Sequence, residues 1–140
     1  MLAGSFVDTN IFVYAADQRD LEKQGLAIEL NQSLRSMGTG VVSYQVIQEY
    51  INVALRGSLS GDGPERLMEE VAHTFASYRT IWPSVELYAQ AILLQSRYKF
   101  QWYDCLIVAA ALEAGCGTLY TEDLQHGQMI GSVRVVNPFL

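Results

Sequence analysis

Residues 5–16 read SFVDTNIFVYAA, in which a short apolar run, a polar Asp-Thr-Asn step and a longer apolar run follow one another. The first run, residues 5–7, has the length and composition of a buried β-strand. The polar step offers side-chain oxygens that can cap a helix over residues 11–16. An acidic residue, Asp8, therefore lies where a strand ends and a helix begins.

The same alternation of strand and helix continues along the chain. Further strands are expected over residues 41–42, 79–82, 118–120 and 133–136. Helices are expected over residues 21–34, from residue 43 or 44 to a break at 57–63, and over 64–75, 85–98 and 104–113. The last of these is apolar all round except for Glu113, which is typical of a buried helix. This order predicts an α/β domain with a mainly parallel sheet covered by helices on both faces.

Length and composition support one globular domain over residues 1–140. Hydrophobic residues make up 50% of the chain and charged residues 17%, which argues against disorder and leaves apolar surface for a partner. No apolar run reaches the roughly 18 residues of a membrane span, and no Lys or Arg precedes the first apolar stretch as in a secretory signal. We therefore expect a cytoplasmic protein.

Cys105 and Cys116 adjoin an apolar segment and are expected to be structural thiols.

Four acidic side chains occupy comparable places in this pattern: Asp8, Glu49, Asp104 and Asp123. Asp8 and Asp123 directly follow strands. Asp104 opens a helix that leads into a strand, and Glu49 lies within about two turns of the start of another helix. Because helices in such a fold run antiparallel to the strands, all four acids are expected at the carboxyl edge of the sheet. Ligands of open α/β folds bind at that edge.

Convergence of four carboxylates requires a compensating cation. Each pair of charges at about 4 Å repels by about 1 kcal/mol in water and about 4 kcal/mol at an effective dielectric of 20. Ligands that are all oxygen favour Mg²⁺ or Mn²⁺, as one or two ions. The net charge of -6 argues against a nucleic-acid binder. The acids account for much of that charge locally, however, and divalent ions would return positive charge where a phosphate would lie.

Each acid also has an ordinary structural explanation. Asp8 and Asp104 could cap helices, and Asp123 could be a turn residue. Glu49 lies at the margin of an apolar stripe and could be a solvated helix residue. The hypothesis of a shared site therefore depends on the common placement of the four acids.

Polar neighbours of the acids could support such a site. Thr9, Asn10 and Thr121 could hydrogen-bond a ligand carboxylate or a bound water, although capping explains them nearly as well. His126 has no partner at ligand spacing and is expected in a surface loop.

An aromatic run precedes Asp104. Phe100, Trp102 and Tyr103 could stack on unpaired bases, or they could pack against the protein. The only basic residues close by in the sequence are Arg97 and Lys99.

Four segments, taken in order, resemble the successive motifs of a PIN domain: residues 6–11 (FVDTNI), 43–49 (SYQVIQE), 103–112 (YDCLIVAAAL) and 119–124 (LYTEDL). The pattern covers essentially the whole chain and is similar to that of the VapC toxins of bacterial and archaeal toxin–antitoxin pairs. Tyr103 is a mild departure, since tryptophan is common at this place in related toxins. Here the tryptophan lies one position earlier.

The resemblance implies a three-layer α/β/α sandwich, residues 1–140 forming a single PIN-like domain, and a ribonuclease activity that depends on Mg²⁺ or Mn²⁺. Carried over by position, Asp8, Glu49, Asp104 and Asp123 become the catalytic and metal-binding acids. A cognate antitoxin and dimeric or larger assemblies are implied as well. Single-stranded or loop RNA is the expected substrate, because a shallow groove reads exposed bases more readily than a closed duplex.

Two other functions compete with this interpretation. A metal-dependent phosphatase or receiver-type phosphoacceptor using Asp8 would need a second acid two residues later or a lysine after a later strand. Position 10 is Asn, and the chain has only Lys23 and Lys99. The second rival is a catalytically silent domain that keeps the fold and binds a partner or RNA; the complete set of four acids argues against it.

Overall fold

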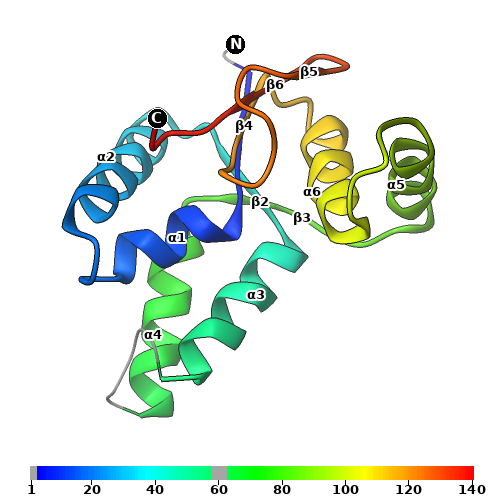
Figure 1. Ribbon diagram of the computed structural model, residues 1–140. Helices are drawn as coiled ribbons and strands as arrows, with labels where there is room; N and C mark the ends of the chain where they lie inside the picture. The colour runs from blue at the N-terminus through cyan, green and yellow to red at the C-terminus, as the bar shows by residue number, and fades with distance from the viewer. Residues whose placement is uncertain (1–2, 58–62) are drawn as a thin grey trace.

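The computed structural model describes residues 3–57 and 63–140 (Figure 1). The strands are β1 (Ser5–Val7), β2 (Gly40–Ser43), β3 (Arg79–Ile81), β4 (Thr118–Tyr120), β5 (Met129–Ile130) and β6 (Val133–Val136). The helices are α1 (Thr9–Ala16), α2 (Leu21–Met37), α3 (Tyr44–Leu55), α4 (Pro64–Phe75), α5 (Val85–Tyr98) and α6 (Trp102–Glu113). The expected break at 57–63 lies mostly outside the described residues.

One sheet contains these strands in the order β3-β2-β1-β4-β6-β5. All neighbouring strands are parallel except β5 and β6, which are antiparallel. From β1 the chain first adds strands on one side, β2 and then β3, and afterwards crosses over to add β4 on the other side. The strand order therefore reverses between β1 and β4. In open α/β sheets the carboxyl ends of the strands at such a reversal form the ligand crevice.

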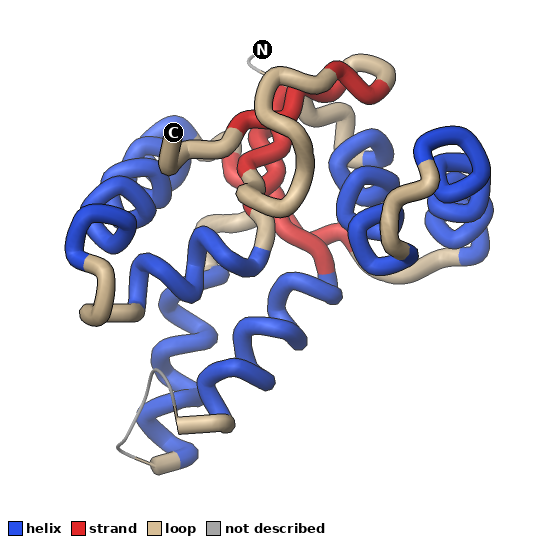
Figure 2. The backbone as a smooth tube through the Cα atoms, in the orientation of Figure 1, coloured by secondary structure: helices blue, strands red, loops and turns tan. Residues whose placement is uncertain are grey.

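The reversal also explains the layers, because right-handed crossovers in opposite directions place their helices on opposite faces of the sheet. Figure 1 shows α1 and α2 on one side of the strands and α5 and α6 on the other, and Figure 2 shows the strands between these helices. Helix α6 contacts β2 and β4, and α5 packs against α6. Helices α3 and α4 pack together beyond the carboxyl edge (Figure 1). The expected three-layer α/β/α sandwich is confirmed.

The core lies on both faces of the central strands. Phe6, Val7 and Leu119 are fully buried, and α6 buries apolar side chains around most of its circumference. This burial confirms the prediction that α6 is an internal helix. Cys105 and Cys116 are free, buried thiols, as expected.

The structure corrects several sequence-based boundaries. Helix α6 begins at Trp102, so Asp104 lies within its first turn and does not open it. Helix α2 extends to Met37 and ends at Gly38, whose φ of 67° suits glycine. Trp82 lies outside β3. Strand β5 was not expected at all, since two residues are too few to show an alternating pattern.

None of the helices in residues 3–57 and 63–140 is long and apolar enough to cross a membrane.

Gly40 allows a close approach between β2 and a buried tyrosine. A Cβ atom at this position would lie 2.6 Å from Tyr78 Cδ1. The Tyr78 ring cannot move aside freely, because it packs edge-on against Phe12 at 5.2 Å and its hydroxyl donates to Asn31 Oδ1 inside the core.

Gly40→Ala is therefore expected to lower the free energy of unfolding by about 1–3 kcal/mol, the usual cost of overpacking. Gly25→Ala is the matched control, because a Cβ there meets nothing within 4 Å and alanine favours the interior of α2. It should raise stability, by up to about 1 kcal/mol. Urea denaturation followed by circular dichroism measures both changes, and equal stability of Gly40→Ala and the parent would contradict the packing argument.

Candidate metal centre

The candidate site begins where β1 and β4 end side by side. Their register pairs Val7 with Tyr120, and the Asp8 backbone N–H donates to the Tyr120 carbonyl oxygen at 3.0 Å. The next residue after each strand is Asp8 and Thr121, respectively. Thr121 Oγ1 donates to Asp8 Oδ2 at 2.8 Å, so the end of one strand orients the acid at the end of the other.

Asp8 is the most buried of the four acids, with 5% of its surface exposed. It caps α1 by accepting a hydrogen bond at Oδ1 from the Thr9 backbone N–H at 2.7 Å. The pKa of Asp8 is raised to about 7. Burial is the main cause, the nearby Asp123 and Glu49 charges add to it, and the hydrogen bonds from Thr121 and Thr9 oppose it. The cap is therefore real, but it does not compensate for desolvation of the charge.

Asp123 lies in the turn that follows β4. Its backbone N–H donates to Thr121 Oγ1 at 3.1 Å, and Asn10 Nδ2 donates to its Oδ2 at 3.1 Å. Partial desolvation raises the pKa of Asp123, and the neighbouring Glu122 charge adds to this effect. Asn10 and Thr121 thus tie the acidic turn to the start of α1.

The other two acids come from α3 and α6. Glu49 is exposed on α3, and Asp104 is half-buried in the first turn of α6. Partial burial raises the pKa of Asp104, with further contributions from the Asp123 and Glu49 charges. Glu49 is therefore close enough to Asp8 and Asp104, and Asp123 to both as well, for their charges to interact.

Three of the four acids, Asp8, Glu49 and Asp123, line one cavity of about 380 Å³. Asp104 lies beside this cavity and does not line it. Within the described part of the chain, no three acidic, histidine or cysteine side chains are gathered closely enough to hold one metal ion among them. The structure thus places the four acids in one region.

The donors in the cavity suit a divalent cation with oxygen ligands. Mg²⁺ usually keeps several waters and is held through only one or two carboxylates, so a closed set of three acids is not required. Thr9 Oγ1 and Asn10 Oδ1 are buried and have no hydrogen-bond partner among the described residues. A bound cation would supply a partner for these two oxygens and offset the desolvation of the Asp8 carboxylate.

Sequence reasoning missed the basic residue at this cavity. Arg19 lines it, and it is the single basic residue to do so in the part of the chain that the structure describes. Arg19 Nη2 lies 2.8 Å from Asp17 Oδ2, and Arg19 Nε lies 2.9 Å from Asp17 Oδ1. Asp17 and Arg19 reach the cavity because they lie in the turn after α1. A turn has no periodic sequence pattern, so its position at the cavity could not be predicted from the sequence.

A second group, not expected from the sequence, adjoins the acidic turn. Lys23 of α2 donates to Tyr14 and to Glu122, both at 3.2 Å, and Tyr14 donates to Glu122 at 2.8 Å. The Lys23 ammonium also lies 4.5 Å from the centre of the Tyr14 ring and 5.2 Å from that of Phe139. We call Tyr14, Lys23, Glu122 and Phe139 the clasp. It fixes the residue that precedes Asp123.

The remaining candidates separate into packed and exposed residues. His126 is exposed in a loop, as expected, and its Nδ1 accepts a hydrogen bond from the Asn137 backbone N–H at 3.0 Å. Phe100 packs, with its ring stacked on that of Tyr98 at 5.2 Å. Trp102 and Tyr103 are exposed.

The sequence matches the PIN domain family over residues 5–129, and the chain belongs to that family. No curated protein sequence matches it significantly.

Solved structures share the fold at 18% sequence identity. A toxin–antitoxin complex from Klebsiella pneumoniae matches with a TM-score of 0.69 over 96% of this chain and 98% of that chain. VapBC2 from Rickettsia felis, bound to a DNA fragment from its promoter, matches with 0.66 over 94% and 96%. Mycobacterium tuberculosis VapC20, described as a toxin that cleaves the sarcin–ricin loop, matches with 0.63 over 86% and 92%.

The raised pKa of Asp8 predicts that stability falls as pH rises. Its pKa is about 7 in the folded protein against an ordinary value of 3.8, so between these values the folded state holds a proton that the unfolded state has released. The free energy of unfolding falls with pH wherever the folded state binds more protons. The metal-free protein should therefore lose up to about 4 kcal/mol across this window.

Urea denaturation in EDTA at about pH 5 and about pH 8 measures this slope. Asp8→Asn, which cannot ionise, should remove most of it, whereas Glu113→Gln at the far end of α6 should retain it. A parent protein that is equally stable at both pH values would show that the Asp8 charge is compensated within the fold.

Proposed function

We propose that this chain is a metal-dependent endoribonuclease and the toxin of a VapBC-type toxin–antitoxin pair. The observation that carries the proposal is the shared cavity of Asp8, Glu49 and Asp123, with Asp104 beside it, at the carboxyl edge where the strand order reverses. Membership of the PIN domain family and the toxin structures among its structural relatives support the same activity.

Asp8, Glu49, Asp104 and Asp123 would hold Mg²⁺ or Mn²⁺, as one or two ions. A bound divalent ion lowers the pKa of water and offsets the negative charge that develops on phosphate oxygens during hydrolysis. Asp8 supplies a carboxylate that is kept out of bulk water, and Thr121 fixes its orientation through one oxygen. Asn10 does the same for Asp123.

Arg19 is placed to receive the RNA backbone. The acids would repel a phosphate in the absence of a cation, and the guanidinium of Arg19 lies on the wall of the same cavity. Its side chain is 79% exposed, so the pairing with Asp17 leaves it accessible to a phosphate. Arg19 would thereby hold the substrate close to the acids without taking part in the chemistry.

The antitoxin partner is proposed from the structural relatives together with the apolar surface. Complexes of toxin with antitoxin are among the structures that share the fold. This chain exposes several large apolar side chains on α3, α4 and α5, among them Leu55, Met68 and Leu93. Dimers or larger hetero-oligomers are proposed on the same grounds as the antitoxin.

Cleavage of RNA tests the nuclease directly. With Mn²⁺ or Mg²⁺ the protein should release fragments from single-stranded RNA, and EDTA should abolish the release. Thr121→Val, which removes the hydroxyl that orients Asp8, should lower the rate by about 10–100-fold, and Asp8→Asn should lower it further. Denaturing gel analysis of end-labelled RNA gives the rates.

Glu113→Gln, which alters an exposed acid remote from the cavity, is the matched control and should cleave at the parent rate. Hydrolysis of small phosphoesters with no action on RNA would favour the phosphatase. Tight binding of RNA or of a protein partner with no cleavage in either metal would favour the silent interaction domain.

Expression in a bacterial host tests the toxin role. Synthesis of the parent chain alone should arrest growth, and Asp8→Asn at the same protein level should not. Coexpression with the neighbouring reading frame should relieve the arrest, because an antitoxin encoded there would bind the toxin and inhibit it. Harmless accumulation of folded, nucleolytically active protein would argue against a toxin and leave the nuclease in place.

A further inference from the structure

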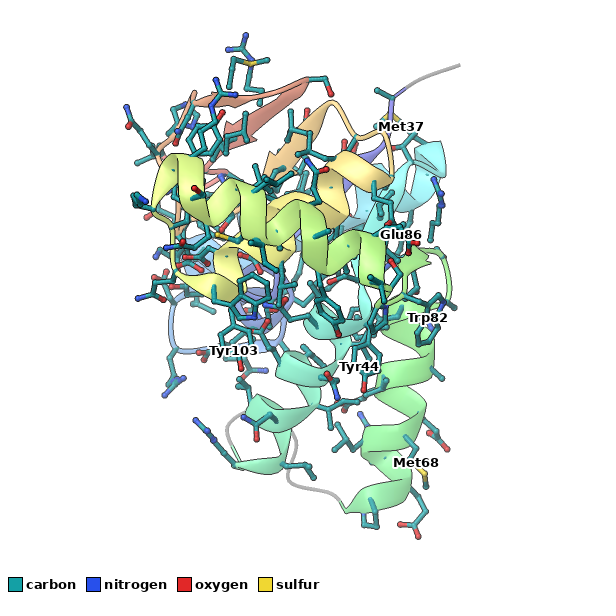
Figure 3. The ribbon with its side chains drawn as sticks, turned by 90° about the vertical axis from the view of Figure 1, so that its right-hand side faces the viewer. Met37, Tyr44, Met68, Trp82, Glu86 and Tyr103 are labelled. Carbon is teal, nitrogen blue, oxygen red and sulfur yellow. The ribbon has the colours of Figure 1, made fainter. Side chains whose placement is uncertain are left out.

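A second pocket, of about 170 Å³, lies beside the acids and is not used in the proposed hydrolysis. Tyr44 and Gln48 of α3, Tyr88 of α5 and Tyr103 of α6 form its walls, and Ser43 lines it at the end of β2. We call it the tyrosine pocket. In Figure 3, Tyr44 lies between Tyr103 and Trp82 on the face turned toward the viewer. No charged side chain of the described residues lines it.

Ser43 provides an unused polar group in this pocket. It occupies the N-cap position of α3, where a serine hydroxyl normally accepts a hydrogen bond from the helix backbone, yet it makes no such bond. The residue is only 4% exposed, and Ser43 Oγ has no hydrogen-bond partner among the residues that the structure describes. A buried hydroxyl without a partner costs free energy, so a ligand that bonds to it gains affinity.

One aromatic wall, Tyr44, is held in a fixed position although it is accessible. The Tyr44 ring lies 5.9 Å from the Trp82 ring, and its hydroxyl accepts a hydrogen bond from Gln48 Nε2 at 2.9 Å. Tyr44 is 39% exposed and Tyr103 is 67% exposed. Because the Tyr44 ring is already ordered, a ligand that stacks on it pays little to immobilise it.

The tyrosine pocket shares no lining residue with the acidic cavity, but its walls adjoin two of the acids along α3 and α6. Tyr103 directly precedes Asp104, and Gln48 directly precedes Glu49. Gln45, one helical turn before Glu49, lines the pocket and donates to the Tyr103 carbonyl oxygen at 3.2 Å. The boundary between α3 and α6 thus carries acids on one side and aromatic rings on the other.

We propose that the tyrosine pocket binds one unpaired base of an RNA strand whose backbone lies on the acids, an inference that rests on the proposed nuclease function. A base is uncharged and flat, with polar groups on its edge. It therefore matches a neutral pocket in which aromatic and aliphatic side chains surround an unpaired hydroxyl and two amides. An aliphatic side chain of a protein partner would fill the pocket but would leave Ser43 Oγ without a hydrogen bond. The pocket selects the nucleotide that lies next to the scissile phosphate.

Binding of short RNA tests the pocket independently of cleavage. The protein carries Asp8→Asn and is titrated in Mg²⁺ at low salt into fluorescein-labelled eight-nucleotide strands of A, C or U. Each base of the tightest-binding strand is then replaced in turn by an abasic residue. One position should show binding weakened by about fivefold or more, which is the loss of one stacked base.

Tyr103→Ala should weaken binding of the intact strand by the same factor and remove the penalty at that abasic position, whereas Tyr103→Phe should behave like the parent. Ser43→Ala should change the order of preference among A, C and U. Met129→Ala, which alters an exposed apolar residue of β5 outside the pocket, is the matched control and should bind like the parent.

An abasic penalty that persists in Tyr103→Ala, or no position-specific penalty, would overturn the proposal. A fall in oligomeric state of Tyr103→Ala in sedimentation, with unchanged RNA binding, would also overturn it and assign the pocket to a contact between protein chains. Base-dependent binding by a protein whose parent cleaves no RNA would instead refute the nuclease and retain the pocket.

Discussion

Burial of the Asp8 carboxylate between the ends of β1 and β4 is the constraint on which the rest of the site depends. Among the described residues, Thr9 and Thr121 donate the two hydrogen bonds that this carboxylate accepts, and these bonds do not offset the loss of hydration. Other acids nearby add repulsion. The fold therefore keeps at its centre a group that favours either a proton or a cation from outside, and the free energy for this comes from the apolar core. Such a cost is typical of functional sites, where stability is given up for reactivity.

The topology of the sheet places the destabilised Asp8 carboxylate where a ligand can bind. The reversal of strand order between β1 and β4 opens the sheet edge at the position of Asp8, and the crossover that follows β3 places α6 against the opposite face. Since α6 is buried around most of its surface, its position is fixed by the core, and so is that of its first turn. Apolar packing far from the cavity therefore determines the position of Asp104 in the first turn of α6.

The parts predictable from the sequence are those fixed by local chemistry. The strand and cap around Asp8 and the buried character of α6 follow from a few adjacent residues, and the parallel sheet follows from their order. Strand β5 depends on pairing with β6, and a two-residue strand carries no pattern of its own. Arg19 and Ser43 owe their surroundings to distant elements, so spacing could not reveal them. Asp104 lies beside the cavity and not in its wall because side-chain direction within a helical turn is decided by packing.

The clasp joins three distant parts of the chain at the acidic turn. Phe139 packs edge-on against Tyr14 with ring centres 5.0 Å apart, and Lys23 contacts both rings as well as Glu122. Residues that follow the final strand are therefore mechanically coupled to the loop that carries Asp123. An affinity tag or fluorescent fusion attached after residue 140 would pull on this coupling, whereas β1 begins at Ser5, at the opposite, amino edge of the sheet.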